Sequence, residues 1–120
     1  MRTRPVARVV LLAANALGVM IASGFSARGL RTPNFGEPDQ PSSPLARFWA
    51  ASSAVRTWSL AIPVLEGLVR GRPVPGLLAT AGLVQLGDSA LGVWRRNRQM
   101  AIAPAVMGAV HLVSARLLSR

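Results

Sequence analysis

The chain of 120 residues contains no cysteine and no lysine, only four acidic residues and a single histidine. Without cysteine, disulfides, thiol chemistry and cysteine-ligated metals are excluded. A haem held between two axial ligands would need a partner for His111, and no second histidine is present to supply one. Because all the basic residues other than His111 are arginine, we interpret the absence of lysine as coding bias in a GC-rich genome. The sequence therefore predicts no cofactor and no metal site.

The arginines give the chain a formal net charge of +10. A DNA-binding protein would place such residues along one solvated helix or ribbon. Here most of them stand in short groups beside apolar stretches, as is typical of anchors at a membrane–water boundary. These groups are Arg2, Arg4 and Arg8; Arg28 and Arg31; Arg70 and Arg72; Arg95, Arg96 and Arg98; Arg116 and Arg120. We expect a lipid bilayer as the partner and no nucleic acid.

Four apolar stretches account for most of the chain, and 51% of its residues are hydrophobic. Each stretch approaches or exceeds the ~20 residues that cross a bilayer as a helix. The predicted spans are residues 5–27, 45–69, 74–94 and 99–118, within a single membrane domain covering 1–120. A proline-rich exposed loop at 28–44 joins the first two spans, and short turns join the others. The sequence predicts an all-α, integral membrane four-helix bundle with up-down-up-down topology.

The first stretch also resembles a cleaved signal peptide, with a basic start, an apolar middle and small residues at 22–24. Its uncharged run is longer than a usual signal core and three more spans follow, so we favour a retained helix. An even number of spans places both termini on one side. That side carries about seven arginines against about six on the other. This slim excess favours cytoplasmic termini, in a bacterial plasma membrane.

The two middle spans each carry one polar stripe at helical spacing. A charge in hydrocarbon costs several kcal/mol, so both stripes are expected to face inward. The stripe in the second span comprises Ser52, Arg56, Ser59, Pro63 and Glu66, and that in the third Ala81, Gln85, Asp88, Gly92 and Arg95.

Depth along the helices predicts which polar groups meet. Arg56 and Asp88 are each 16 residues from Arg72, which is ~24 Å of helix, so we expect them to form an ion pair. Counted from the next turn, Gln85 and His111 lie at ~15 and ~18 Å. Polar groups from all four helices should then converge on one layer and line a ligand pocket. Its predicted residues are Asn15, Ser52, Arg56, Ser59, Gln85, Asp88 and His111.

Polar residues inside a membrane can also act as structural glue between helices, without any chemistry. That interpretation fits Arg56 and Asp88 well. It explains His111 less well, because structural glue does not need a side chain that changes charge near neutral pH. Glu66, Asp88 and His111 are residue types that can bind a metal. However, Glu66 is predicted to lie near the opposite interface, too far from the other two for one site. The catalytic candidates, should the protein be an enzyme, are Asp88 and His111.

Three short motifs carry a family resemblance: Ala-Val-Arg-Thr at 54–57, Leu-Gly-Asp at 86–88 and Ala-Val-His-Leu at 109–112. The segment from Ala54 to His111 resembles small four-span bacterial and fungal membrane proteins that are loosely similar to the DoxX-like membrane proteins. Thr57 stands where that family often has an acidic residue. The resemblance implies a four-helix membrane bundle and no particular reaction.

These observations lead us to expect a small integral membrane protein with a polar intramembrane pocket that binds a lipophilic small molecule. One alternative is an intramembrane isomerase or cyclase that uses Asp88 and His111 as acid and base. Another is a structural or accessory subunit of a membrane complex, either as a homo-oligomer or with another membrane protein. A pocket beside Asp88 and His111 would favour binding or catalysis, and a fully packed core would favour the subunit.

Overall fold

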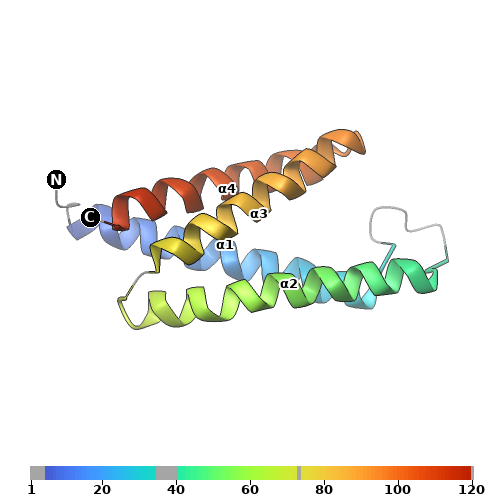
Figure 1. Ribbon diagram of the computed structural model, residues 1–120, viewed down its shortest axis with the longest axis horizontal. Helices are drawn as coiled ribbons and strands as arrows, with labels where there is room; N and C mark the ends of the chain where they lie inside the picture. Colours follow the sequence, from blue (N-terminus) through green and yellow to red (C-terminus); the bar gives the residue numbers. More distant parts are fainter. Residues whose placement is uncertain (1–4, 35–40, 73, 120) are drawn as a thin grey trace.

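The computed structural model describes residues 5–34, 41–72 and 74–119, which form four helices and no strand. These are α1 (Pro5–Arg31), α2 (Pro44–Val69), α3 (Pro75–Trp94) and α4 (Arg98–Leu118). They run alternately up and down, so that α1 begins and α4 ends at the same end of the bundle (Figure 1). The predicted all-α four-helix bundle is confirmed, and α2, α3 and α4 each match the predicted range to within one residue.

The helix starts are set by side-chain caps and by proline. Ser43 accepts a hydrogen bond from the backbone N–H of Ala46 at 3.0 Å, and proline follows in the first turn of α2. Asn97 accepts in the same way from the N–H of Met100 at 3.0 Å at the start of α4. Each side-chain oxygen satisfies one N–H group that has no partner within its helix. The turn between α2 and α3 uses Gly71, whose φ of +63° is readily adopted only by glycine.

The first helix extends four residues beyond its predicted end, so the loop predicted at 28–44 begins later, after Arg31. Thr32 donates its hydroxyl hydrogen to the carbonyl of Arg28 at 3.0 Å, which closes the last turn. Pro33 then stops the helix, because proline disfavours helical backbone in the residue before it. The central part of that loop, with Glu37 and Asp39, lies outside the described residues.

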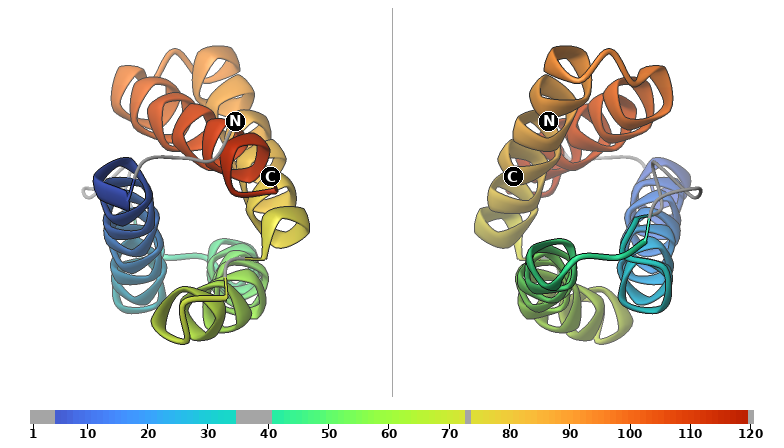
Figure 2. Two further views of the ribbon diagram at one scale, coloured as in Figure 1. Left: turned by 90° about the vertical axis from the view of Figure 1, so that its left-hand side faces the viewer. Right: turned by 90° about the vertical axis from the view of Figure 1, so that its right-hand side faces the viewer.

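The helices associate as two hairpins. In an end-on view α1, α2, α3 and α4 follow one another around a ring (Figure 2). Contacts are dense within the α1–α2 and α3–α4 hairpins and sparse between them, even though a short turn joins α2 to α3. The seam between α2 and α3 is therefore the less tightly packed side of the molecule.

The α3–α4 hairpin is tight because two glycines face each other. A Cβ atom on Gly82 would lie 3.0 Å from the carbonyl oxygen of Gly108, and one on Gly108 would lie 3.0 Å from the carbonyl oxygen of Gly82. Small residues let membrane helices approach in this way. Nearer the turn, Ser89 donates its hydroxyl hydrogen to the carbonyl of Ala101 at 2.5 Å. These contacts fix the register of α3 against α4.

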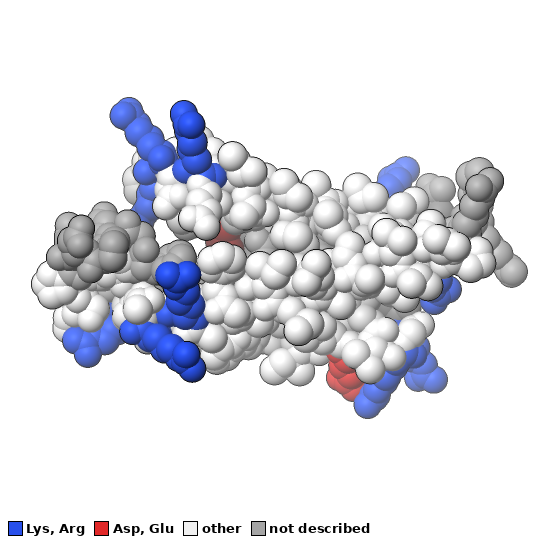
Figure 3. All heavy atoms as spheres, turned by 180° about the vertical axis from the view of Figure 1, so that it is seen from behind, with Lys and Arg blue, Asp and Glu red and all other residues white. Residues whose placement is uncertain are grey.

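The distribution of polarity is the reverse of that in a water-soluble protein. Leu17, Ile62 and Leu83 are more than 60% exposed, whereas Asn15 and His111 are among the most buried side chains. On the face drawn in Figure 3, arginines gather towards the two ends and uncharged atoms cover the middle. Apolar outer surfaces and satisfied inner polar groups are what hydrocarbon as a solvent requires.

Three of the helices in the described part of the chain, α1, α3 and α4, are long and apolar enough to cross a membrane. The second helix is long enough at 26 residues, but its serines, its threonine and Arg56 reduce its mean hydropathy. The bundle extends 52 Å along its longest axis, more than the ~40–45 Å of a bilayer with its headgroups.

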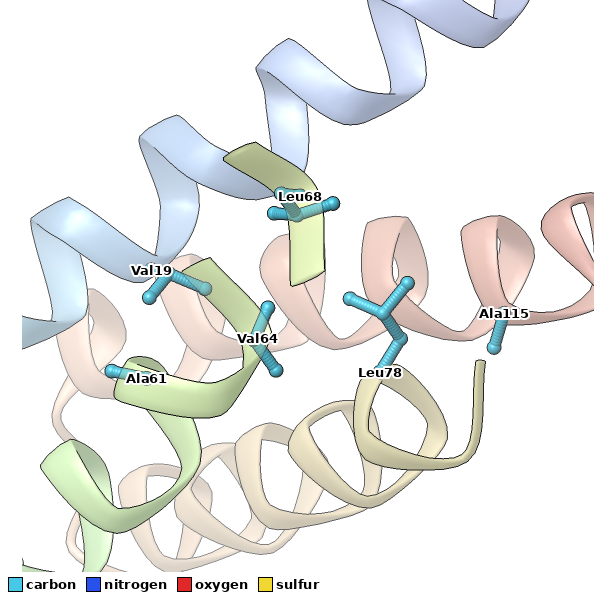
Figure 4. Close-up of a cluster of buried hydrophobic side chains, with 6 residues drawn as sticks. All are labelled: Val19, Ala61, Val64, Leu68, Leu78 and Ala115. Atoms are coloured by element: carbon cyan, nitrogen blue, oxygen red, sulfur yellow. The ribbon is translucent and has the colours of Figure 1, made fainter. Parts of the chain in front are cut away.

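A cluster of buried apolar side chains draws on all four helices (Figure 4). Val64 and Leu78 are fully buried in it, and both belong to the halves of α2 and α3 that are nearest to the connecting turn. This core holds the hairpins together at one end of the bundle. The cluster comprises Val19, Ala61, Val64, Leu68, Leu78 and Ala115.

Candidate functional site

A buried polar network joins α1 to α4. The side-chain nitrogen of Asn15 donates to the carbonyl of Leu11 at 2.6 Å and to the hydroxyl of Ser114 at 2.7 Å. The side-chain oxygen of Asn15 lies 2.7 Å from Nδ1 of His111. Asn15, His111 and Ser114 are 0, 2 and 0% exposed. The network lies in the interior of the bundle, and it satisfies every polar group of Asn15.

This geometry determines which nitrogen of His111 carries hydrogen. The carbonyl of Leu11 can only accept a hydrogen bond, so the atom of Asn15 that faces it must be the nitrogen. The oxygen of Asn15 then faces Nδ1 of His111 and can only accept, so Nδ1 must donate. In the neutral imidazole, Nε2 is left with a free lone pair.

The predicted ion pair between Arg56 and Asp88 is present. Nη2 of Arg56 lies 2.9 and 3.0 Å from the two carboxylate oxygens of Asp88, which joins α2 to α3 across the seam. The side chains are 45 and 24% exposed. The pair is therefore part-buried and reaches the outer surface of the bundle, although we expected it in the interior.

The polar groups lie at two levels, and the single layer that we expected is not observed. A Cβ on Gly82 would meet Gly108 and Leu112, so His111 lies close to the level of Gly82. Asp88 is six residues further along α3, which corresponds to ~9 Å of helix. No hydrogen bond joins His111 to Asp88 or Gln85, and its partner is Asn15. The depths counted from the two turns placed these groups at one level, but His111 and Asp88 differ by ~9 Å along the helix axis.

The polar stripe of α2 does not face the interior, contrary to our prediction. Ser59 and Glu66 are exposed, and Ser52 is only half-buried. Glu66 pairs with Arg70 at 3.0 Å on the surface. The inward face of α2 consists of Ala54, Ala61, Val64 and Leu68. It lies on nearly the opposite side of the helix from the stripe, because Ala54, Ala61 and Leu68 each come two residues, or about 200°, after Ser52, Ser59 and Glu66. Close packing of the four small or branched apolar residues decides which face turns inward, and Arg56 reaches Asp88 from the edge.

A partly open cavity of about 40 Å³ lies between the helices. Three of the predicted pocket residues line it: Gln85, Asp88 and His111. Asn15 lies behind His111, while Ser52, Arg56 and Ser59 do not reach the cavity. The rest of the lining is mostly apolar and draws on α1, α2 and α3: Val19, Ala22, Thr57, Leu60, Ala61, Val64, Ala81 and Val84.

Sequence reasoning missed two polar residues of the site. Ser114 completes the network around Asn15, and its place three residues after His111 on one helical face was a usable signal. Thr57 lines the cavity, and we had considered it only as a departure from a family motif. Its position next to Arg56 puts it about 100° closer to the inward face of α2.

Several polar groups around the cavity have no partner among the described residues. Thr57 and Gln85 form no side-chain hydrogen bond there, and neither does Nε2 of His111. No fully buried side-chain nitrogen or oxygen in that part of the chain lacks a hydrogen bond. Nε2 must therefore keep some accessible surface, and His111, which is only 2% exposed, lines the cavity. These groups are available to a bound molecule.

The fold and the site define a small four-helix bundle with three candidate membrane spans, an apolar exterior and a cavity with polar groups at mid-bundle. Within the described residues, no three histidine or acidic side chains are grouped as a metal site would require. No protein-family model, curated protein or solved structure matches the chain. Arguments about function therefore rest on the cavity itself.

Proposed function

We propose that this protein is a four-span integral membrane protein whose central cavity binds a lipophilic small molecule. The observation that carries this proposal is the cavity itself, with apolar walls and three polar groups that have no partner among the described residues. Such a combination is typical of small-molecule sites, where apolar walls give affinity and a few polar groups orient the ligand. In this proposal α2 is the fourth span, and its arginine is neutralised by Asp88.

The ligand would reach the cavity from the bilayer through the seam between α2 and α3. Asp88 lines the cavity and is also 24% exposed at the outer surface. Leu60 and Val84, from the same two helices, also line the cavity and are half-buried. On the opposite side, between α1 and α4, the bonds of Asn15 close the bundle.

Extraction of copurified molecules tests the proposal. The protein is purified in a mild detergent, and the lipophilic molecules that it retains are identified and quantified by mass spectrometry. Ala22→Leu places three extra carbons in the lining, and Ala13→Leu makes the same change on the exposed face of α1. We expect the wild type and Ala13→Leu to retain a defined molecule and Ala22→Leu to lose it. Recovery of the same bulk lipids from all three would refute the binding function.

An intramembrane isomerase or cyclase is a second candidate, because Asp88 and His111 line the same cavity. Their separation of ~9 Å along the helix axis would place them at two ends of one substrate. In this reading Asp88, paired with Arg56, would take a proton from one end of the substrate as the base, and Nε2 of His111, in the protonated imidazolium, would give one to the other end as the acid. A His111→Gln variant that retained the ligand but lost turnover would support catalysis. Unchanged turnover would exclude a proton-transfer role for His111.

The third candidate is a subunit of a membrane complex, and the exposure of Arg56 favours it. A guanidinium side chain that is 45% exposed beside hydrocarbon is better accommodated when a second protein covers it. Cross-linking in native membranes tests this, with the label at position 56 and a control label at Leu17 on the outer face of α1. Capture of a partner, or of a second copy, only through position 56 would favour the subunit role.

The relationship to the DoxX-like proteins also remains a prediction.

A further inference from the structure

We infer that the ligand is a neutral lipophilic alcohol whose hydroxyl group donates a hydrogen bond to Nε2 of His111. This inference rests on the proposed function, because it specifies the chemistry of the molecule that the cavity holds. It follows from the hydrogen-bonding capacity of the groups around the cavity, from their charge balance and from the volume.

The imidazole of His111 requires a donor. Nδ1 already donates to Asn15, so the neutral ring presents Nε2 as an acceptor. Leaving a buried acceptor unpaired costs about 1–3 kcal/mol. A ketone, ester or ether group can only accept, and would leave Nε2 without a partner. A lipophilic ligand satisfies it only through an O–H or N–H group.

Two other polar groups of the cavity lining favour a ligand that also accepts a hydrogen bond. These are Gln85 and Thr57, and both carry donor hydrogens that no described residue uses. Gln85 is three residues from Gly82, so it lies ~4.5 Å along the axis from the level of His111. A hydroxyl group is small and can donate to Nε2 while accepting from Gln85 or Thr57.

The charge balance of the cavity favours a neutral ligand. Asp88 is the one acidic side chain in the lining, and Arg56 already occupies both of its carboxylate oxygens. An ammonium group would have to compete with Arg56, and an anionic group would meet acceptors at Asp88 and His111. Neither gains enough to offset its own transfer out of water.

The volume of the cavity limits how much of the ligand is enclosed. About 40 Å³ holds on the order of three water-sized probes, which suits the hydroxyl group and the carbons next to it. The rest of a hydrocarbon chain would lie in the seam between Leu60 and Val84, where α2 and α3 make few contacts. A long-chain alcohol fits this description, because only its polar end needs the cavity.

The test compares two probes that differ only in the donor. The full chain in lipid nanodiscs is equilibrated with dodecanol or with its methyl ether at equal mole fraction, and bound molecules are counted by native mass spectrometry. We expect the wild type to bind the alcohol about tenfold more tightly than the ether, which corresponds to 1.4 kcal/mol. Gln85→Met and His111→Phe should reduce that preference while still binding the ether. Val113→Leu, on the exposed face of α4, is the matched control and should preserve it.

Each result decides the question. Equal binding of alcohol and ether by the wild type, or a preference for the ether, overturns the inference and leaves the lipophile-binding function standing. Binding of neither probe, with water alone at Nε2, overturns both. Because the decisive comparison uses the wild type, it does not depend on whether His111→Phe folds.

Discussion

Asn15 is the residue on which the interior polarity of this bundle depends. Its amide bonds to its own helix and to two residues of α4, so one side chain satisfies a hydroxyl, a ring nitrogen and a carbonyl. Such a group is worth more than its own hydrogen bonds, because its loss leaves other buried groups unpaired.

Replacing Asn15 by leucine should therefore destabilise the protein by about 1–3 kcal/mol, the cost of leaving buried polar groups without partners. Thermal unfolding in detergent measures this effect. Met20→Leu, a similar change on the exposed face of α1, is the control and should have little effect. If both variants melted at the wild-type temperature, Asn15 would not hold the network together.

The ion pair between Arg56 and Asp88 is the second polar contact on which stability depends. Asp88→Asn would leave Arg56 charged and unpaired within the bundle. We expect a loss of about 2–3 kcal/mol, less than the 3–5 kcal/mol of fully buried pairs because both side chains are part-exposed. Ser59→Ala, on the exposed face of α2, should be nearly neutral. Equal melting temperatures for the two variants would contradict an energetic role for the pair.

At the scale of elements, the α3–α4 hairpin has the closest helix packing in the described part of the chain. Gly82→Ala would place a methyl group 2.7 Å from Cγ of Leu112 and 3.0 Å from the carbonyl oxygen of Gly108. Forcing extra volume into a packed contact costs about 1–3 kcal/mol. The same change at Gly87, on the same helix, meets nothing within 4 Å.

We therefore expect Gly82→Ala to lower the unfolding temperature and Gly87→Ala to leave it unchanged or raise it. A helical glycine replaced by alanine in open space gains about 0.5–1 kcal/mol. The difference between these two variants of α3 isolates the cost of the close approach. A destabilised Gly87→Ala, or an unaffected Gly82→Ala, would contradict the observed packing.

The sequence predicted the helices well because the gaps between charged groups are close to the length of a span. It also predicted the pairing of Arg56 with Asp88, because a short turn makes depth along two neighbouring helices countable. It failed for the face of α2, where Ser59 and Val64 were both plausible inward residues until packing selected between them. The cavity could not be predicted either, since its walls depend on how Leu60 and Val84 meet across a loose seam.

At the scale of the whole molecule, α1 begins and α4 ends on the same side of the bundle (Figure 1). Reporter fusions before α1 and after α4 should therefore give the same location, and the small arginine excess predicts the cytoplasm. A fusion in the turn between α3 and α4 is the control and should report the opposite side. Different locations for the two ends would mean that a helix does not cross the membrane, or that α1 is removed.

The uneven pairing of the helices has a consequence for how the chain is synthesised. The second helix is not among the three candidate membrane spans and carries Arg56, and it contacts α1 closely and α3 only sparsely. When α2 leaves the ribosome, Asp88 has not yet emerged from it, and α1 is the only partner present. We expect insertion of α2 to depend on α1 as a preceding helix, and Arg56 to wait at an interface until Asp88 arrives. The order of translation would then be part of how this protein reaches its fold.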